Sequence, residues 1–168
     1  QGLTLDLLRL YARWFKRADV YFRLADFDPA VALLTERINR EPHNTELFLQ
    51  RAYAHFYLED YLHARADTER ALAANPANLA AISLQGGVAY SLGLTAEAWR
   101  MIERAETVKP GWSLGRLNRA VLLREEGRLE EALAEADQAV EGGIRGDGAY
   151  PSSPVLGYLV RSLIRYGR

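Results

Sequence analysis

Apolar residues recur at helical spacing along most of the chain, and polar turns interrupt them at regular distances. In residues 4–25 they recur every three or four positions, which predicts one helix that Thr4 can cap. Asp28-Pro29 then supplies a cap residue followed by a proline at the first helical position. This pair predicts a second helix that continues to about Arg40 and ends before Pro42.

The pattern that follows repeats with a constant spacing. Pro42, Pro76 and Pro110 are evenly spaced (76 − 42 = 34 and 110 − 76 = 34), and Ala64 recurs as Ala98 at the same distance. A period between about 20 and 50 residues is typical of stacked supersecondary units rather than one closed domain. The sequence therefore predicts an array of helical hairpins.

The spacing divides the chain into four repeats of equal length. They cover residues 11–44, 45–78, 79–112 and 113–146, and residues 1–10 extend the first helix. Short turns are predicted inside the later hairpins at Glu59-Asp60, Gly93-Leu94 and Gly127-Arg128. Residues 147–168 hold the end of a Gly-rich loop, Gly142 to Ser153, and a last helix from Pro154 to Tyr166. This helix is either a cap on the array or the first helix of a truncated fifth repeat.

The repeat resembles the tetratricopeptide repeat (TPR), whose pattern is W-x2-L-G-x2-Y, then A-x3-F, then P, with the same period. In residues 11–44 the matching residues are Trp14, Ala18, Tyr21, Ala30, Leu34 and Pro42. In residues 79–112 they are Ile82, Gly86, Ala89, Ala98, Ile102, Ala105 and Pro110. The resemblance implies an all-α fold, a right-handed superhelical α-solenoid of antiparallel helix pairs.

One departure from the TPR pattern is systematic, because its leucine position holds arginine or glutamine in every repeat. Arg51 and Arg119 coincide with acidic residues of the facing helix, Asp67 and Glu135. We therefore predict ion pairs Arg51–Asp67 and Arg119–Glu135 inside these two hairpins. The alternative is that both arginines lie along the surface with their charged ends in water.

Helical geometry separates two faces on the first helix of each repeat. One face holds the small residue of the hairpin contact, and the other holds aromatic and polar residues. The TPR resemblance implies that the second face lines a concave groove that binds a peptide. Its residues are Phe15, Asp19, Arg23, Leu49, Gln50, Tyr53, Phe56, Tyr57, Ser83, Gly87, Tyr90, Leu117, Asn118, Val121 and Arg124.

Some of these aromatic residues have a second interpretation, since Phe56 and Tyr90 lie in a column where aromatic side chains pack adjacent repeats together. The polar clamp by which some TPR proteins hold a peptide's terminal carboxylate is absent, because its columns contain Phe15, Asp19, Gln50, Ala80 and Leu84. An apolar and aromatic groove favours an internal extended segment or an amphipathic helix as ligand.

Composition excludes several other classes of function. The 168 residues carry a net charge of −1, and no segment concentrates positive charge as nucleic-acid binding requires. No apolar run reaches the roughly 18 residues of a membrane span, and no secretory leader is recognisable. The chain begins at Gln1, which suggests a start inside a longer gene product or one left by processing or cloning, and its compartment stays open between bacterial cytoplasm and periplasm.

Candidate catalytic and metal-binding residues are few. His55, Glu59 and His63 are spaced by four, which on one continuous helix would form a metal-binding face. The predicted turn at Glu59-Asp60 interrupts that helix, and His55 is predicted to point into the hairpin. No serine has a histidine and a carboxylate at the spacing of a catalytic triad. We therefore predict no catalytic residue, no metal site and no cofactor.

The sequence thus predicts a non-catalytic protein–protein interaction scaffold. Two alternatives stay open. The chain could be a regulatory or substrate-presenting module of a larger enzyme or envelope-assembly protein. It could also self-assemble into homo-oligomers through the ends of the solenoid.

Overall fold

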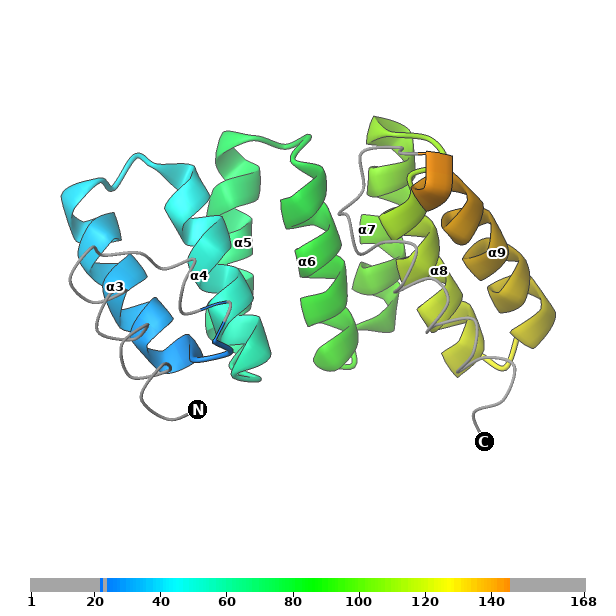
Figure 1. Cartoon of the computed structure of the whole chain (residues 1–168), viewed down its shortest axis with the longest axis horizontal. Helices are drawn as coiled ribbons and strands as arrows, with labels where there is room; N and C mark the ends of the chain where they lie inside the picture. The colour runs from blue at the N-terminus through cyan, green and yellow to red at the C-terminus, as the bar shows by residue number, and fades with distance from the viewer. Residues whose placement is uncertain (1–21, 23, 146–168) are drawn as a thin grey trace. The chain divides into compact units, whose positions relative to one another are not determined.

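The computed structural model describes residue 22 and residues 24–145, and this part of the chain contains helices and turns but no strand (Figure 1). Its helices are α3 (Phe27–Arg40), α4 (Thr45–Tyr57), α5 (Tyr61–Ala74), α6 (Leu79–Ser91), α7 (Thr95–Val108), α8 (Ser113–Glu125) and α9 (Leu129–Arg145). None of these helices is long and apolar enough to cross a membrane. Phe15, Asp19, Arg23 and the predicted helix from Pro154 to Tyr166 lie outside the described residues.

The helices begin at the intervals that the sequence spacing predicts. The first helices α4, α6 and α8 begin at residues 45, 79 and 113, and the second helices α3, α5, α7 and α9 begin at 27, 61, 95 and 129. Each series advances by one repeat period per helix. The fold is therefore all-α and built from repeated helical hairpins.

The turn inside each hairpin uses a left-handed residue at a fixed position. At these turns the residues with positive φ are Ala25 (52°), Glu59 (60°), Gly93 (73°) and Gly127 (77°), which are again one repeat period apart. The residue after the left-handed one donates its N–H to the carbonyl five residues earlier. For example, Asp60 donates to the carbonyl of His55 at 2.9 Å. This bond closes the end of the first helix and reverses the chain within a few residues.

Two helix ends differ from the prediction. Helix α3 begins after Asp26 rather than after Asp28, so the predicted cap is wrong by two residues and Asp28 lies in the first turn. A carboxylate there still interacts favourably with the unpaired N–H groups of the helix start. Helix α9 continues to Arg145, so the predicted loop does not begin at Gly142.

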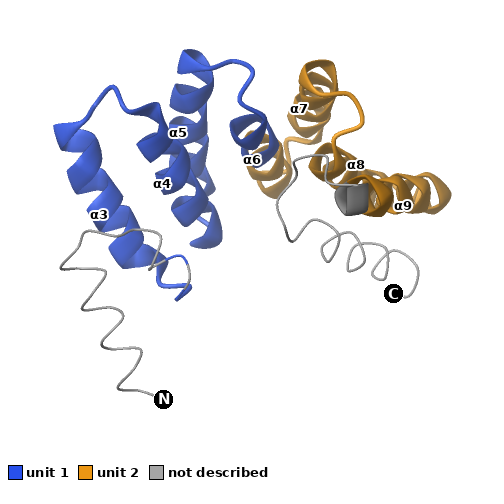
Figure 2. Cartoon of the chain, turned by 45° about the horizontal axis from the view of Figure 1, so that its top comes forward, with its two compact units in different colours: residues 1–84 blue, residues 85–168 orange. Residues whose placement is uncertain are grey.

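The chain forms two compact units, residues 1–84 and residues 85–168, which divide within α6 (Figure 2). In the first unit, α4 packs against both α3 and α5. One cluster of buried apolar residues in this unit contains Leu34, Ile38, Leu47 and Phe48. These residues come from α3 and α4, which belong to adjacent repeats, so the contact between repeats buries an apolar side of each helix.

In the second unit, α8 packs against α7 and α9. One buried cluster contains Ala120, Leu123, Ala132 and Ala136, and partly buried Trp99 packs against it. The helices of a hairpin approach closely where side chains are short: Ala64, Ala98 and Ala132, which are equivalent residues of successive repeats, are at most 1% exposed. Larger side chains at these positions would force the two helices apart.

Candidate functional site

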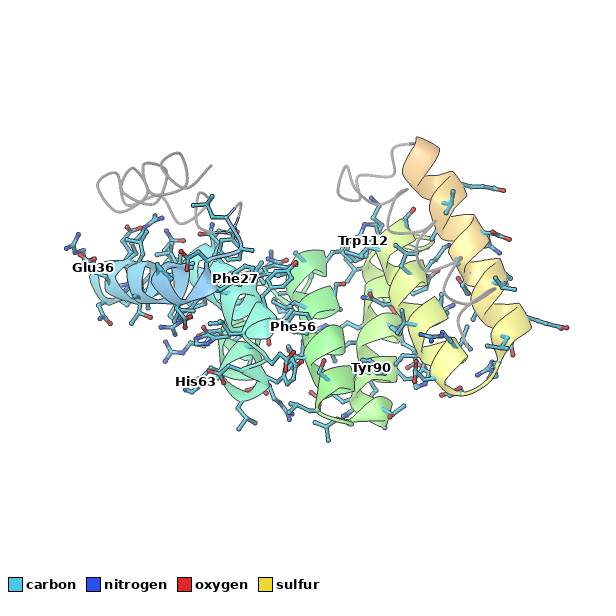
Figure 3. The ribbon with its side chains drawn as sticks, turned by 60° about the horizontal axis from the view of Figure 1, so that its bottom comes forward. Phe27, Glu36, Phe56, His63, Tyr90 and Trp112 are labelled. Atoms are coloured by element: carbon cyan, nitrogen blue, oxygen red, sulfur yellow. The ribbon has the colours of Figure 1, made fainter. Side chains whose placement is uncertain are left out.

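Aromatic side chains meet where α3, α4 and α5 come together in the first unit (Figure 3). We call Phe22, Phe27, Phe56, Tyr57 and Tyr61 the aromatic cluster. The ring of Tyr57 stacks on Phe27 with centroids 4.7 Å apart and an interplanar angle of 13°. Phe56 makes edge-to-face contacts with Tyr57 at 6.1 Å and with Tyr61 at 5.7 Å. Tyr57 is 58% exposed, so the cluster presents a rigid aromatic surface to solvent.

Phe27 and Tyr61 belong to this cluster but not to the predicted groove. Both are the first residue of a second helix, and they are one repeat period apart (61 − 27 = 34). Their shared register was visible in the sequence. However, the sequence pattern does not distinguish the first residue of a helix from the preceding turn. The direction of its side chain depends on the backbone geometry at the end of the preceding helix.

Among the described residues of the first unit, the other predicted groove residues are less exposed than Tyr57. Leu49 is only 4% exposed, whereas Gln50, Tyr53 and Ser83 are half-buried. The Tyr53 hydroxyl donates to the carbonyl of Ala80 at 3.5 Å. Tyr57 is therefore the most exposed aromatic residue of α4.

In the second unit, the predicted groove residues divide in a similar way. Leu117 is 2% exposed, Tyr90 is 37% exposed, and Gly87, Asn118, Val121 and Arg124 are half-buried. Burial, followed by the negative charge of Glu125, raises the pKa of the Tyr90 phenol. Tyr90 thus stays protonated at neutral pH and keeps a hydroxyl that can donate a hydrogen bond.

The predicted ion pair between Arg51 and Asp67 is confirmed. Two parallel hydrogen bonds join them, from Nε to Oδ2 at 2.7 Å and from Nη2 to Oδ1 at 2.8 Å. The remaining Nη1 donates to the Thr35 hydroxyl at 3.0 Å, so Arg51 links α4 to α3 as well as to α5. The hydrogen bond to Asp67 raises the pKa of Arg51 despite the opposing effect of burial. Such bidentate pairs are among the stronger side-chain interactions.

The predicted pair between Arg119 and Glu135 is also confirmed, with Nη1 to Oε1 at 3.3 Å. Glu135 additionally accepts a hydrogen bond from Arg116 Nη1 at 3.0 Å, which the sequence did not indicate. One carboxylate therefore serves two arginines of α8, and neither arginine makes a bidentate contact with it.

A second polar group lies at the turn between α4 and α5. We call His55, Asp60 and His63 the turn cluster. The Nδ1 atom of His63 lies 2.8 Å from both carboxylate oxygens of Asp60, and the Nδ1 atom of His55 lies 3.2 Å from Asp60 Oδ2. The two imidazole rings stack with centroids 5.2 Å apart. The turn interrupts the helix as predicted, but it also brings the two histidines together around Asp60, which the sequence did not indicate.

The environment shifts the pKa of two members of the turn cluster. Burial lowers the pKa of His55, and the negative charges of Asp60 and Asp67 only partly oppose this effect. For Asp60, burial alone would raise the pKa. Hydrogen bonds from the ring and backbone N–H of His63 outweigh burial, so the pKa of Asp60 lies below its usual value. Asp60 is thus a carboxylate at neutral pH.

A surface pocket of about 480 Å³ lies in the second unit between α7, α8 and α9. It is lined by Trp99, Glu103, Arg119, Leu123, Arg128, Glu131, Ala134 and Glu135. Two ion pairs lie in its lining: Arg128 with Glu131 at 2.7 Å and Arg119 with Glu135 at 3.3 Å. Both arginines of the lining are thus already engaged by carboxylates, so neither is a ready partner for an anionic ligand.

Comparison with known proteins relates this fold to others. No protein-family model matches the sequence. A 69-residue stretch is 38% identical to the human Protein SGT1 homolog, and it covers 40% of this chain and 19% of the length of that protein.

Solved structures match over more of the chain. One is the TPR protein TTC0263 of Thermus thermophilus, with a TM-score of 0.70 and 16% identity over 88% of this chain and 87% of that one. Another is the second TPR domain of human RPAP3 in complex with an HSP70 peptide, with a TM-score of 0.60 and 19% identity over 70% of this chain and 97% of that domain. The fold of this protein is therefore that of TPR proteins.

Proposed function

We propose that this protein is a non-catalytic interaction module that binds a segment of another protein against the exposed side of α4. The observation that carries the proposal is the aromatic cluster with Tyr57 at its surface, stacked on Phe27. A large apolar ring that is held in place and still 58% exposed is prepared for burial by a partner.

The energetics of the cluster favour this use. A ring already fixed by stacking loses little conformational entropy when a ligand covers it, so more of the burial free energy remains for affinity. The hydroxyl of Tyr57 can also hydrogen-bond to a polar group of the ligand. Tyrosines of this kind are frequent among the few residues that dominate binding at protein interfaces.

The type of segment follows from the residues beside the cluster. The human RPAP3 domain, which has the same fold, is in complex with an HSP70 peptide. Here the columns of the carboxylate clamp include Gln50, Ala80 and Leu84, and Leu84 is 5% exposed. With no cation at these positions, we propose an internal extended segment or an amphipathic helix rather than a chain terminus as ligand.

On the second unit we propose a separate, smaller contact surface formed by Tyr90, Asn118, Val121 and Arg124. These residues lie on α6 and α8, and they combine one exposed phenol with polar and aliphatic side chains. The phenol of Tyr90 and the guanidinium of Arg124 suit hydrogen bonds to the backbone carbonyls of a ligand.

The proposal is tested by selecting ligands from a displayed library of random peptides and measuring their affinity by fluorescence polarisation. The double substitution Tyr53→Ala and Tyr57→Ala should weaken the selected peptides about tenfold or more, because it removes the anchoring rings. Circular dichroism should show unchanged helicity. Capping the peptide's C-terminus as an amide should have no effect, since an internal segment is recognised.

Leu62→Ala provides the matched control, because Leu62 is 71% exposed on α5 and belongs to none of the proposed contact residues. It should bind the peptides like the unmodified protein. Equal affinity in the double variant would show that the α4 surface is not the binding site. Loss of binding on amidation would instead indicate recognition of a chain end.

A further inference from the structure

The turn cluster has the chemistry and spacing of a metal-binding site. The ligand atoms of His55, Asp60 and His63 all lie within 4.8 Å of one another. Ligand atoms about 2.1 Å from a tetrahedral zinc ion lie roughly 3.4 Å apart. The separation between His55 Nδ1 and Asp60 Oδ2, 3.2 Å, is close to this value. The separation between His63 Nδ1 and Asp60, 2.8 Å, needs a small opening, which a side chain that is 72% exposed can make.

The backbone holds these three residues in place without any metal. The N–H of Asp60 donates to the carbonyl of His55 at 2.9 Å, which fixes the end of α4 against the start of α5. Asp60 also caps α5, since its side chain accepts a hydrogen bond from the N–H of His63. A site fixed by its scaffold requires little reorganisation when an ion binds.

One atom of the cluster points to a ligand independently of the spacing. The Nδ1 atom of His55 is buried and has no hydrogen-bond partner, although Asp60 Oδ2 lies only 3.2 Å away. Both oxygens of Asp60 instead face the ring of His63. A buried polar atom without a partner is costly, and coordination of a cation would satisfy it.

We propose that His55 Nδ1, His63 Nδ1 and the Asp60 carboxylate bind one divalent transition-metal ion of the zinc type at the α4–α5 turn. Two imidazoles and one carboxylate form a donor set that binds such ions in preference to magnesium or calcium, which favour oxygen ligands alone. When the ion binds, it takes the place of the hydrogen bond between His63 Nδ1 and Asp60, and Nδ1 no longer carries a proton. The exposed Nε2 of His63 then carries the N–H of the neutral ring. Water completes the coordination.

The rest of the array supplies an internal comparison. At the turn between α8 and α9, the residues equivalent to His55, Asp60 and His63 are Leu123, Arg128 and Glu131 (123 − 55 = 68, twice the repeat). That turn has the same backbone hydrogen bond, from Arg128 N–H to the Leu123 carbonyl at 2.9 Å. The donor set is therefore not required by the fold, because the same turn forms without it.

The consequence of metal binding would be local. The ion would join the last turn of α4 to the first turn of α5, directly beside Phe56 and Tyr61 of the aromatic cluster. It would stabilise the hairpin as a cross-link does, since the unfolded chain does not hold the three ligands together. No reaction at the ion is implied.

The test uses the full chain without a polyhistidine tag, stripped with a chelator and titrated with zinc chloride in a calorimeter. We expect one zinc ion per chain. We also expect a rise in melting temperature on the order of 5 °C at a zinc concentration about a hundred times the dissociation constant. Cobalt(II) substitution should give the visible absorption of a four-coordinate ion, and a chelator should reverse both effects.

His63→Ala should weaken zinc binding by about a hundredfold or more, because loss of even an outer-shell partner typically costs about tenfold. Asp60→Asn should weaken it as well, and asparagine still caps α5. His43→Ala is the matched control. It removes the third histidine of the chain, which is exposed and outside the cluster, and should leave binding unchanged.

Three outcomes would overturn the proposal. The first is a stoichiometry far below one ion per chain. The second is equal zinc affinity in His63→Ala and the unmodified protein. The third is an equal loss in His43→Ala, which would indicate adventitious binding by surface histidines.

Discussion

The hairpins α4–α5 and α8–α9 have equivalent helix starts and turns but different polar side chains. They are two repeats apart, since 113 − 45 = 68 and 129 − 61 = 68. Ala52 and Ala120 on their first helices are both fully buried, as are Ala64 and Ala132 on their second helices. Two helices can thus pack at the same closeness while the remaining positions vary. The small residues define the hairpin, and the other columns determine its chemistry.

The clearest chemical difference is in the ion pair that crosses each hairpin. The side chain of Asp67 is 6% exposed and accepts hydrogen bonds from both Nε and Nη2 of Arg51. Glu135 is 17% exposed and shares single contacts with two arginines that are 24% and 29% exposed. Breaking a more buried pair costs more free energy, because the partner that remains is a buried charge without compensation.

The largest predicted effect tests this difference. Asp67→Ala should lower the free energy of unfolding by about 3 kcal/mol, because it leaves the charge of Arg51 partly buried with Thr35 as its remaining partner. Glu135→Ala should cost about 1.5 kcal/mol, since its two arginines can reach water. Urea denaturation followed by circular dichroism measures both values.

Glu69→Ala serves as the control for the loss of a carboxylate, because Glu69 pairs with Arg65 on the exposed side of α5. Exposed pairs of this kind contribute less than about 1 kcal/mol. If Asp67→Ala and Glu135→Ala lower the free energy of unfolding by the same amount, burial does not explain the difference between the two ion pairs.

A second prediction concerns what the two hairpins share. Ala64→Leu and Ala132→Leu should each destabilise the protein by about 2 kcal/mol, because neither interface has space for three additional carbon atoms. Thermal unfolding of the two variants should therefore show similar losses. A tolerated leucine in only one of them would mean that the two hairpins are not packed alike.

Much of this architecture could be predicted from sequence, because it depends on spacing. The constant repeat period predicted the positions of the helices, and it placed Arg51 opposite Asp67 and Arg119 opposite Glu135. These pairs are predictable since both partners lie in helix interiors, where register alone determines which side chains face each other.

The turns were harder to predict, because their side chains depend on local backbone geometry rather than on helical period. Asp60 was read only as a turn residue, yet the left-handed φ of Glu59 places it beside His55. Phe27 and Tyr61 were missed for the same reason, as both follow such a turn. The burial of Leu49 and Leu117 was also not evident from sequence. Helical geometry gives the direction of a side chain but not which neighbouring residues cover it.

The smallest predicted effect separates the two turns themselves. Glu59 and Gly127 occupy equivalent positions, with φ of 60° and 77°, but only glycine adopts this conformation without steric cost. Glu59→Gly should therefore stabilise the protein by about 0.5 kcal/mol, after subtracting the greater entropy of glycine in the unfolded chain. Gly127→Ala should destabilise it by about 1 kcal/mol, although no atom lies within 4 Å of the added methyl group.

The opposite signs of these two changes make the measurement informative, because both concern exposed residues that contact little. The difference between the two changes in stability therefore reports the steric cost of a side chain at a left-handed backbone position, rather than side-chain packing. Melting temperatures of the two variants, compared at equal ionic strength, decide the question. Destabilisation by Glu59→Gly would mean that the glutamate side chain contributes more at this turn than its backbone strain costs, and the two turns would then differ in more than their left-handed residue.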